Sequence, residues 1–362
     1  MNDRAIEAAE VVLACTELDP TQRFFTEQLG FRIEEIFPAD DPRVATLSGH
    51  GLRLRLERGG EAAPGTLRLR CADPGAVADG ATELTAPNGT RVELVAEPAL
   101  VVPPVVPSLS VTRMGGDWGV GRAGMRYRDL IPDRQGGYVI ASHIRIPDAG
   151  PVPDYVHFHK IRFQMIYCYR GWVRLVYEDQ GPPFVMAAGD CVLQPPEIRH
   201  RVLESSAGLE VIEVGVPAEH MTCVEHTFDL PTDAVRPDRD FGGQRFTLHQ
   251  VANATWQPWR LDGFEARDIG FEAATDGLAS AKVVRITGNA MEEATRHDAE
   301  LVFLFVLEGG VTLAADGHDV QALGTGDAVI VPAGLGHAFT DCAPDFELLE
   351  VTLPAAFATT PA

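Results

Sequence analysis

Two segments of this chain repeat one pattern of glycine, proline and histidine. Gly189 to His200 and Gly326 to His337 are each eleven residues apart, so GDCVLQPPEIRH aligns with GDAVIVPAGLGH. Upstream, His159 to Gly171 and His297 to Gly309 both span twelve residues. A unit that recurs with the same internal spacings predicts two copies of one domain.

The chain from Gly137 onward consists of short β-forming stretches separated by glycine, proline or aspartate. They include YVIASHIRI, FQMIYCY and WVRLVYE in the first copy, and LVFLFVLEGGVTLAA and ELLEVTL in the second. Many short strands at regular spacing are typical of all-β barrels and jelly rolls. We therefore predict a mainly β fold with two tandem barrels, which follow a small α/β domain at the N-terminus.

The repeated motifs resemble those of the cupin superfamily. The first copy has both motifs, with His157, His159, Gln164 and Gly171, then Gly189, Pro195 and His200. The second copy keeps the second motif, with Gly326, Pro332, Gly334 and His337, but Thr295 and Val302 replace the first histidine and the acidic or amide residue of the first motif. The chain thus resembles a bicupin, which implies two tandem jelly-roll barrels and a metal site in the first.

Side-chain alternation supports a metal site in the first copy. His157 and His159 are two residues apart, so on a strand they point to the same face, and Gln164 and His200 can approach from neighbouring strands. Three imidazoles and an amide can bind one divalent ion, for which we favour Fe, with Ni, Zn and Mn as alternatives. A barrel in which these residues only form hydrogen bonds with one another is the competing interpretation.

Other residues have weaker predicted roles. Tyr155 shares the parity of the two histidines, and Glu204 shares the face of His200 if the strand is regular, so both are catalytic candidates. We expect Phe158, Phe163, Met165 and Ile166 to give the site an apolar surround. In the second copy only His297 and His337 remain, and we expect no metal there.

The N-terminal quarter has a different pattern. Its β-α-β-β-β order and the phrase FFTEQLGFRIEEIF resemble a module of the glyoxalase/vicinal-oxygen-chelate family, and a shortened second module ends in PNGTRVELVAE. The resemblance places that family's ligand positions near Glu10, Arg55, Cys71 and Glu93. Because arginine does not ligate metals, we expect this domain to lack the family's metal and to act as a cap or a dimerisation module.

We predict five segments: a glyoxalase-like domain at 1–100, a linker at 101–136, barrel 1 at 137–225, an inter-barrel segment at 226–277 and barrel 2 at 278–362. The net charge of −22 disfavours nucleic acid and membrane surfaces as partners. Six scattered cysteines without a CxxC pair favour a reduced, cytoplasmic protein. The expected partners are a small-molecule substrate and a second copy of the chain in a homodimer.

Three functions fit the predicted site. The first is a mononuclear iron dioxygenase acting on a small oxygenated or aromatic molecule, because a three-histidine site leaves coordination positions open. The second is a redox-neutral isomerase, epimerase or lyase that acts on a sugar or keto acid, with the metal as a Lewis acid. The third is a non-catalytic protein that binds a metal or a small molecule.

Overall fold

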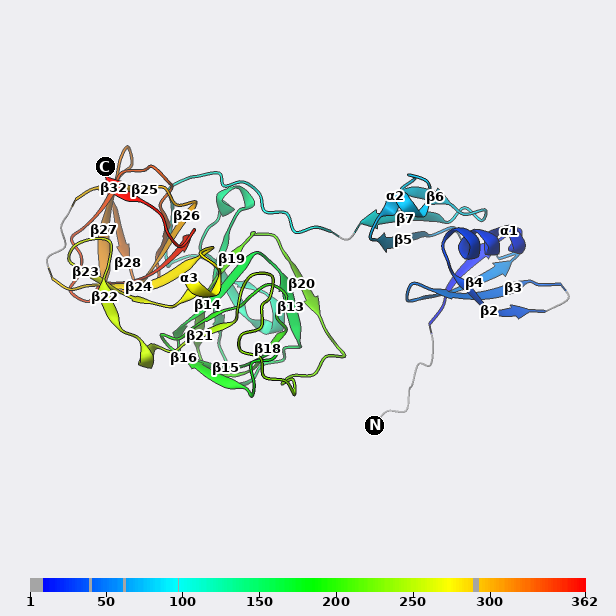
Figure 1. Cartoon of the computed structure of the whole chain (residues 1–362), viewed down its shortest axis with the longest axis horizontal. Coiled ribbons are helices and arrows are strands. Elements are labelled where there is room, and N and C mark those ends of the chain that lie inside the picture. The colour runs from blue at the N-terminus through cyan, green and yellow to red at the C-terminus, as the bar shows by residue number, and fades with distance from the viewer. Residues whose placement is uncertain (1–8, 39–40, 61–62, 97, 289–292) are drawn as a thin grey trace. The chain divides into compact units, whose positions relative to one another are not determined.

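The computed structural model describes residues 9–38, 41–60, 63–96, 98–288 and 293–362 (Figure 1). It divides the chain into two compact units, Met1–Ala99 and Leu100–Ala362. No helix within the described ranges is long and apolar enough to cross a membrane. The described residues form a mainly β structure, as predicted.

The N-terminal unit contains the predicted β-α-β-β-β order. Its four-stranded sheet has the order β1-β4-β3-β2, with β1 parallel to β4. A helix and a π-helical turn cover this sheet and bury Phe24 and Phe25 in the core of the unit. The elements are β1 (Val11–Cys15), α1 (Leu18–Arg23), η1 (Phe24–Gln28), β2 (Arg32–Phe37), β3 (Val44–Gly49) and β4 (Leu52–Arg58).

A second, shorter module completes this unit. Its three-stranded sheet has the order β5-β7-β6, with β5 parallel to β7. The elements are β5 (Thr66–Cys71), α2 (Pro74–Val77), β6 (Glu83–Thr85) and β7 (Arg91–Ala96). The short module matches the expectation from the sequence, and the likeness to the glyoxalase family remains a prediction.

Barrel 1 consists of two facing sheets. The larger sheet has the order β21-β17-β14-β19-β11-β10-β9, and the smaller has the order β16-β15-β18-β13-β20, with β12 on β18. The strands are β9 (Gly119–Val120), β10 (Arg126–Asp129), β11 (Ile140–Ile146), β12 (Gly150–Pro151), β13 (His157–Lys160), β14 (Phe163–Arg170), β15 (Trp172–Tyr177), β16 (Phe184–Ala187), β17 (Cys191–Leu193), β18 (His200–Ser205), β19 (Leu209–Val216), β20 (Met221–Val224) and β21 (Thr247–His249).

Barrel 2 repeats this plan. Its larger sheet has the order β22-β23-β24-β31-β26-β29-β8, and its smaller sheet has the order β28-β27-β30-β25-β32. The strands are β8 (Ser110–Thr112), β22 (Trp256–Pro258), β23 (Phe264–Asp268), β24 (Ser280–Ile286), β25 (Thr295–His297), β26 (Leu301–Glu308), β27 (Gly310–Ala315), β28 (Gln321–Gly324), β29 (Ala328–Ile330), β30 (His337–Thr340), β31 (Glu347–Leu353) and β32 (Thr359–Pro361). Short helical turns lie between strands at η2 (Arg122–Gly124), η3 (Arg134–Gly137), η4 (Val251–Asn253) and α3 (Phe271–Ala274).

The barrels exchange edge strands, which corrects the predicted linker at 101–136 and the predicted inter-barrel segment. β8 precedes barrel 1 in the chain but pairs with β29 of barrel 2. β21 follows barrel 1's last strand and returns to pair with β17. β9 and β10 extend the sheet of barrel 1, and β22 and β23 extend that of barrel 2. Both supposed connections therefore contribute strands to the sheets.

The two larger sheets pack against each other through a shared apolar core. Alternate residues of β14, such as Phe163 and Met165, belong to one buried cluster with Phe303 and Phe305 of β26. The residues between them face the interior of their own barrel. Burial of these side chains therefore stabilises the contact between the two barrels.

A buried polar network also joins the barrels. The guanidinium of Arg128 on β10 donates to the carbonyl oxygen of Gly326 (2.7 Å) and to Nδ1 of His143 (3.1 Å). Nε2 of that imidazole donates to the Glu210 carboxylate at 2.8 Å, and Arg145 donates to the same carboxylate. Burial would raise the pKa of Glu210, but these hydrogen bonds outweigh it and lower the pKa to about 2.

Candidate metal centre

Three histidines of barrel 1 converge on one point inside the barrel. His157 and His159 lie on the same face of β13, and His157 is directly opposite His200 of β18 in the antiparallel register. One ligand atom from each ring lies within 4.8 Å of the other two. Within the part of the chain that the structure describes, this is the one group of three or more His, Cys, Asp or Glu side chains with such spacing.

The surrounding hydrogen bonds orient these imidazoles for metal binding. Nδ1 of His157 lies 2.9 Å from the carbonyl oxygen of Tyr155, and Nδ1 of His200 lies 3.0 Å from that of Ile198. Because a carbonyl oxygen only accepts, both Nδ1 atoms carry the hydrogen, and Nε2 is the nitrogen with a lone pair. Nδ1 of His159 is 3.0 Å from the Thr222 hydroxyl. Orientation of ligand rings through the second nitrogen is typical of metal-binding histidines, so the site fits a divalent ion.

Gln164, the predicted fourth ligand, is buried beside a carboxylate. Its Nε2 donates to Glu213 at 2.5 Å, and its Oε1 accepts from Nε2 of Gln194 at 2.8 Å. The Oε1 of Gln194 in turn accepts from the Tyr177 hydroxyl at 2.8 Å. The oxygen of Gln164 keeps a second lone pair, so its role as a ligand stays a prediction.

Sequence reasoning missed Glu213, which lines the same cavity. The signal was present as a further repeat, because Glu213-Val-Gly-Val-Pro in β19 aligns with Glu350-Val-Thr-Leu-Pro in β31. The strand registers agree, since Glu213 pairs with Ile166 and Glu350 pairs with Leu304 at the equivalent position. A single glutamate in a strand gives no sign of facing inward.

His159, His200 and Glu213 line a cavity of about 550 Å³, and His157 lies buried behind it. Tyr155 lies on its wall, as predicted from parity, and its catalytic role stays a prediction. The apolar part of the wall differs from the expected surround, because Phe163 and Met165 face the inter-barrel core while Ile166 faces the cavity. The other aliphatic side chains on the wall are Ala123, Ile140, Leu175, Val202 and Val224.

Glu204 does not lie where the sequence placed it. The pairing of β15 with β18 shifts register between Arg174 and Leu175, and this β-bulge leaves Leu203 as the extra residue. A bulge reverses the alternation of the strand. As a result, Glu204 forms an ion pair with Arg174 (3.4 Å), and Val202 lines the cavity instead.

The strand register shows which residues of barrel 2 occupy the predicted ligand positions of barrel 1. Thr295 pairs with His337 as His157 pairs with His200, and Val302 pairs with Thr352 as Gln164 pairs with Gly215. Val302 is buried and apolar, so it offers no ligand atom.

The two remaining histidines of barrel 2 are oriented differently from their counterparts. Nε2 of His297 donates to the carbonyl oxygen of Val331 at 3.1 Å, so this nitrogen carries the hydrogen. His337 donates from Nδ1 to the Leu335 carbonyl, as His200 does to that of Ile198. The His297 and His337 ring centroids are 6.0 Å apart, against 5.4 Å for His159 and His200.

In the N-terminal unit, the positions that match the glyoxalase ligands are engaged in local contacts. Three of them form ion pairs with neighbouring side chains: Glu10 with Arg53, Arg55 with Glu57, and Glu93 with Arg68. The thiol of Cys71 donates to the carbonyl oxygen of Leu69. The hydrogen bond from Arg68 lowers the pKa of Glu93.

Comparisons with known proteins identify the fold. Residues 282–351 match the family model described as a cupin domain. Oxalate decarboxylases with similar structures include a single-residue mutant of the Bacillus subtilis enzyme (14% identity, 73% of this chain and 81% of that chain, TM-score 0.52). Another is the formate complex of the Lactobacillus farciminis enzyme (14% identity, covering 73% of this chain and 90% of that chain, TM-score 0.51).

A further B. subtilis oxalate decarboxylase structure, described for its Mn(II) centres, has 14% identity, the same coverage as the mutant and a TM-score of 0.51. No curated protein matches the chain. Barrel 2 therefore matches a cupin domain, and the whole of the larger unit shares its tandem-barrel fold with these structures.

Proposed function

We propose that barrel 1 is a mononuclear metal enzyme acting on a small oxygenated organic molecule. The observation that supports this most strongly is the cluster of His157, His159 and His200, in which main-chain carbonyls fix two rings with Nε2 as the ligating nitrogen. A bound divalent ion would supply Lewis acidity, and a redox-active one would also supply electron transfer. Mn, Fe, Ni and Zn all suit this ligand set.

The protein's own contribution centres on Glu213. The amide of Gln164 holds this carboxylate, and the chain through Gln194 to the Tyr177 hydroxyl fixes the amide in turn. A carboxylate held at the wall of the cavity can accept a proton from a bound substrate and return it to another atom. Gln164 therefore acts as a positioning residue for Glu213 whether or not it also ligates the metal.

A redox-neutral reaction, by a lyase or an isomerase on a hydroxy or keto acid, is the candidate that we favour. It uses Glu213 as a proton acceptor next to a Lewis-acidic ion, and it needs no oxidant. The three solved structures compared above are oxalate decarboxylases, and one is described for its Mn(II) centres, which agrees with this class of chemistry.

An iron dioxygenase is the second candidate. The observation that favours it is the aliphatic part of the wall, formed by Ile166, Leu175 and Val202 beside His159 and His200. An apolar cavity next to an ion with open positions suits the binding of dioxygen and an aromatic substrate.

The test is turnover of a panel of hydroxy, keto and aromatic acids by protein loaded separately with Mn(II) or Fe(II), with and without oxygen. Turnover without oxygen that Glu213→Gln reduces at least about 100-fold supports the redox-neutral enzyme. Oxygen uptake with Fe(II) alone supports the dioxygenase. Full metal content without turnover on any substrate would contradict both and leave a metal-binding protein.

A further inference from the structure

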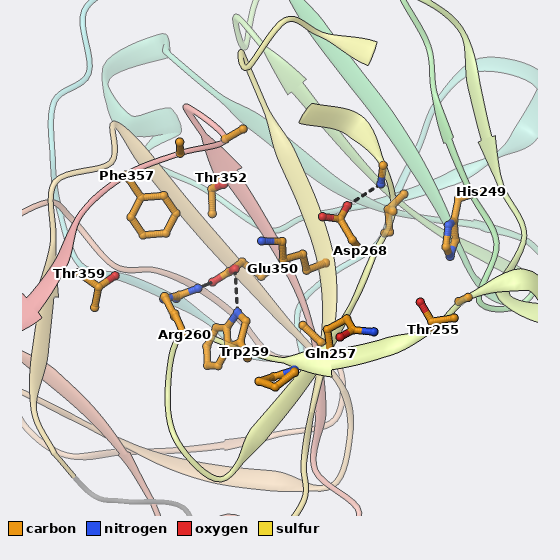
Figure 2. Close-up of a pocket in the computed structure, with 18 of the residues that line it drawn as sticks. His249, Thr255, Gln257, Trp259, Arg260, Asp268, Glu350, Thr352, Phe357 and Thr359 are labelled. Atoms are coloured by element: carbon orange, nitrogen blue, oxygen red, sulfur yellow. Dashed lines mark hydrogen bonds and ion pairs between the residues drawn. The ribbon is translucent and has the colours of Figure 1, made fainter. Parts of the chain in front are cut away.

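A second cavity, of about 710 Å³, lies at barrel 2 (Figure 2). Strands β22, β23, β24 and β31 line it, together with the segments before β22 and after β31. Its volume falls in the usual range for small-molecule sites. The three histidines of barrel 1 do not line this cavity, so it is separate from the metal centre.

One wall is aromatic and has its charges already paired. The Arg260 guanidinium lies 4.0 Å from the Trp259 ring centroid and 5.3 Å from that of Phe357. Its charge is matched by an ion pair with Glu350, which also accepts a hydrogen bond from the Trp259 indole at 3.3 Å (Figure 2). This wall therefore offers apolar ring surface rather than net charge.

Lys282 contributes a cation that no described residue pairs with. The chain has only one other lysine, Lys160. Lys282 lies on β24, where its main chain pairs with Glu350 of β31 on one side and with Asp268 of β23 on the other. It lines the cavity, yet no ion pair or hydrogen bond joins it to a described residue. Asp268 instead accepts from the Gly270 amide at 2.6 Å. The equivalent position in barrel 1 is Ser142.

Thr352 provides the second, independent observation. Its side chain lines the cavity two residues after Glu350 and is 2% exposed, and its Oγ1 has no hydrogen-bond partner among the described residues. A buried hydroxyl without a partner destabilises the protein unless a ligand or a water molecule bonds to it. The equivalent position in barrel 1 is Gly215, so this hydroxyl is specific to barrel 2.

His249 adds a third donor. The Arg267 guanidinium, which can only donate, lies 3.2 Å from its Nε2, so this nitrogen accepts and Nδ1 carries the hydrogen. The cavity thus combines an ammonium, a hydroxyl and an imidazole N–H, while its two carboxylates already have donors. Such a set matches an anion with one negative charge and two acceptor oxygens.

We infer that this cavity binds a small organic carboxylate with an aromatic or apolar body, without the help of a metal. Lys282 and Thr352 contact the carboxylate, and the body lies against Trp259 and Phe357. The site is independent of the proposed reaction in barrel 1, because no metal ligand contributes to it.

Calorimetric titration of the full chain with benzoate and phenylacetate, against benzamide as the neutral analogue, tests this site. The chain also carries His157→Ala and His159→Ala, so that a metal in barrel 1 cannot bind the probes. We expect saturable binding of the carboxylates and at least tenfold weaker binding of benzamide. Lys282→Met should weaken the carboxylates about tenfold or more, since it removes a charge-assisted hydrogen bond.

Three variants complete the design. Lys160→Met removes the other lysine and should leave the affinity unchanged, and Lys282→Arg keeps the charge and should retain most of it. Thr352→Val keeps the shape of the side chain and removes a hydroxyl that bonds to none of the described residues. The variant should therefore fold normally and weaken binding a fewfold. No saturable binding, equal binding of benzamide, or an unchanged affinity in folded Lys282→Met would overturn the inference and leave the metal site of barrel 1 untouched.

Discussion

Barrel 1 and barrel 2 have the same strand order and matching strand registers, yet their interiors differ at a few positions. Thr295 replaces His157 and Val302 replaces Gln164, while both barrels keep an inward-facing glutamate, Glu213 or Glu350. In barrel 1 the glutamate accepts from a neutral amide, and in barrel 2 it pairs with Arg260. The same barrel fold therefore forms with or without the predicted metal ligands.

Loss of the metal in barrel 1 is the largest expected effect. His157→Ala removes one of three imidazoles, so metal content after dialysis should fall at least about 100-fold, because outer-shell changes alone cost 10–100-fold. His337→Ala, at the position equivalent to His200, is the matched control and should keep the metal. Mass-spectrometric metal analysis of both proteins checks this, and full metal in His157→Ala would remove the site from barrel 1.

Restoring the missing histidine sharpens the same comparison. Thr295→His, added to His157→Ala, places a third imidazole opposite His337 and two residues from His297. Metal should return to the protein, bound more weakly than in the native chain, since His297 must first release the Val331 carbonyl. The measurement is metal titration by calorimetry, and a double variant that stays metal-free would show that Thr295 is not what separates the barrels.

The two glutamates should differ in their effect on stability. Glu350→Gln leaves Arg260 largely buried without its counter-charge and should cost about 2–3 kcal/mol, because breaking a desolvated ion pair is expensive. Glu213→Gln keeps an oxygen that can accept the hydrogen bond from the Gln164 amide. The free energy of unfolding should therefore fall by about 1 kcal/mol or less. Urea unfolding of both variants compares them, and equal losses would contradict the different environments that we describe.

A second pair of equivalent glutamates should respond to pH in opposite ways. Hydrogen bonds from His143 and Arg145 lower the pKa of Glu210 to about 2, so its contribution is present above its ordinary pKa near 4.5 and disappears as the pH falls toward 2. Burial raises the pKa of Glu347, so that carboxylate favours folding when protonated and opposes it when ionised.

We therefore expect Glu210→Gln to destabilise the protein at pH 7 by about 2 kcal/mol and to reduce the loss of stability between pH 4.5 and 3. Glu347→Gln should raise the unfolding midpoint at pH 7. Denaturant unfolding of both variants at pH 7, 4.5 and 3 provides the measurement. A change in unfolding free energy of the same sign for the two variants at pH 7 would refute the prediction.

Much of the fold was predictable because the duplicated spacings determine it. The alignment of Thr295 with His157 and of Val302 with Gln164 is confirmed by the strand register. Alternation placed His157 and His159 on one face, but it failed for Glu204, because no residue type in β18 indicates a bulge.

The rest depended on contacts between distant parts of the chain. Alternation places Phe163 and Met165 on the face of β14 opposite Gln164, but what covers that face is Phe303 and Phe305 of barrel 2, about 140 residues later in the chain. The sequence did not predict a strand in the supposed linker, because β29, the partner of β8, lies far along the chain. Next to this pair, the amide of Met114 donates to the Asp327 carboxylate 213 residues later.

This exchange of edge strands has a consequence for inheritance. A gene encoding either half alone would produce a sheet with an open edge, where unpaired main-chain groups invite aggregation. The apolar face formed by Phe163 and Met165 would be bare as well. The two copies are thus no longer separable modules, and barrel 2 cannot be deleted without exposing barrel 1.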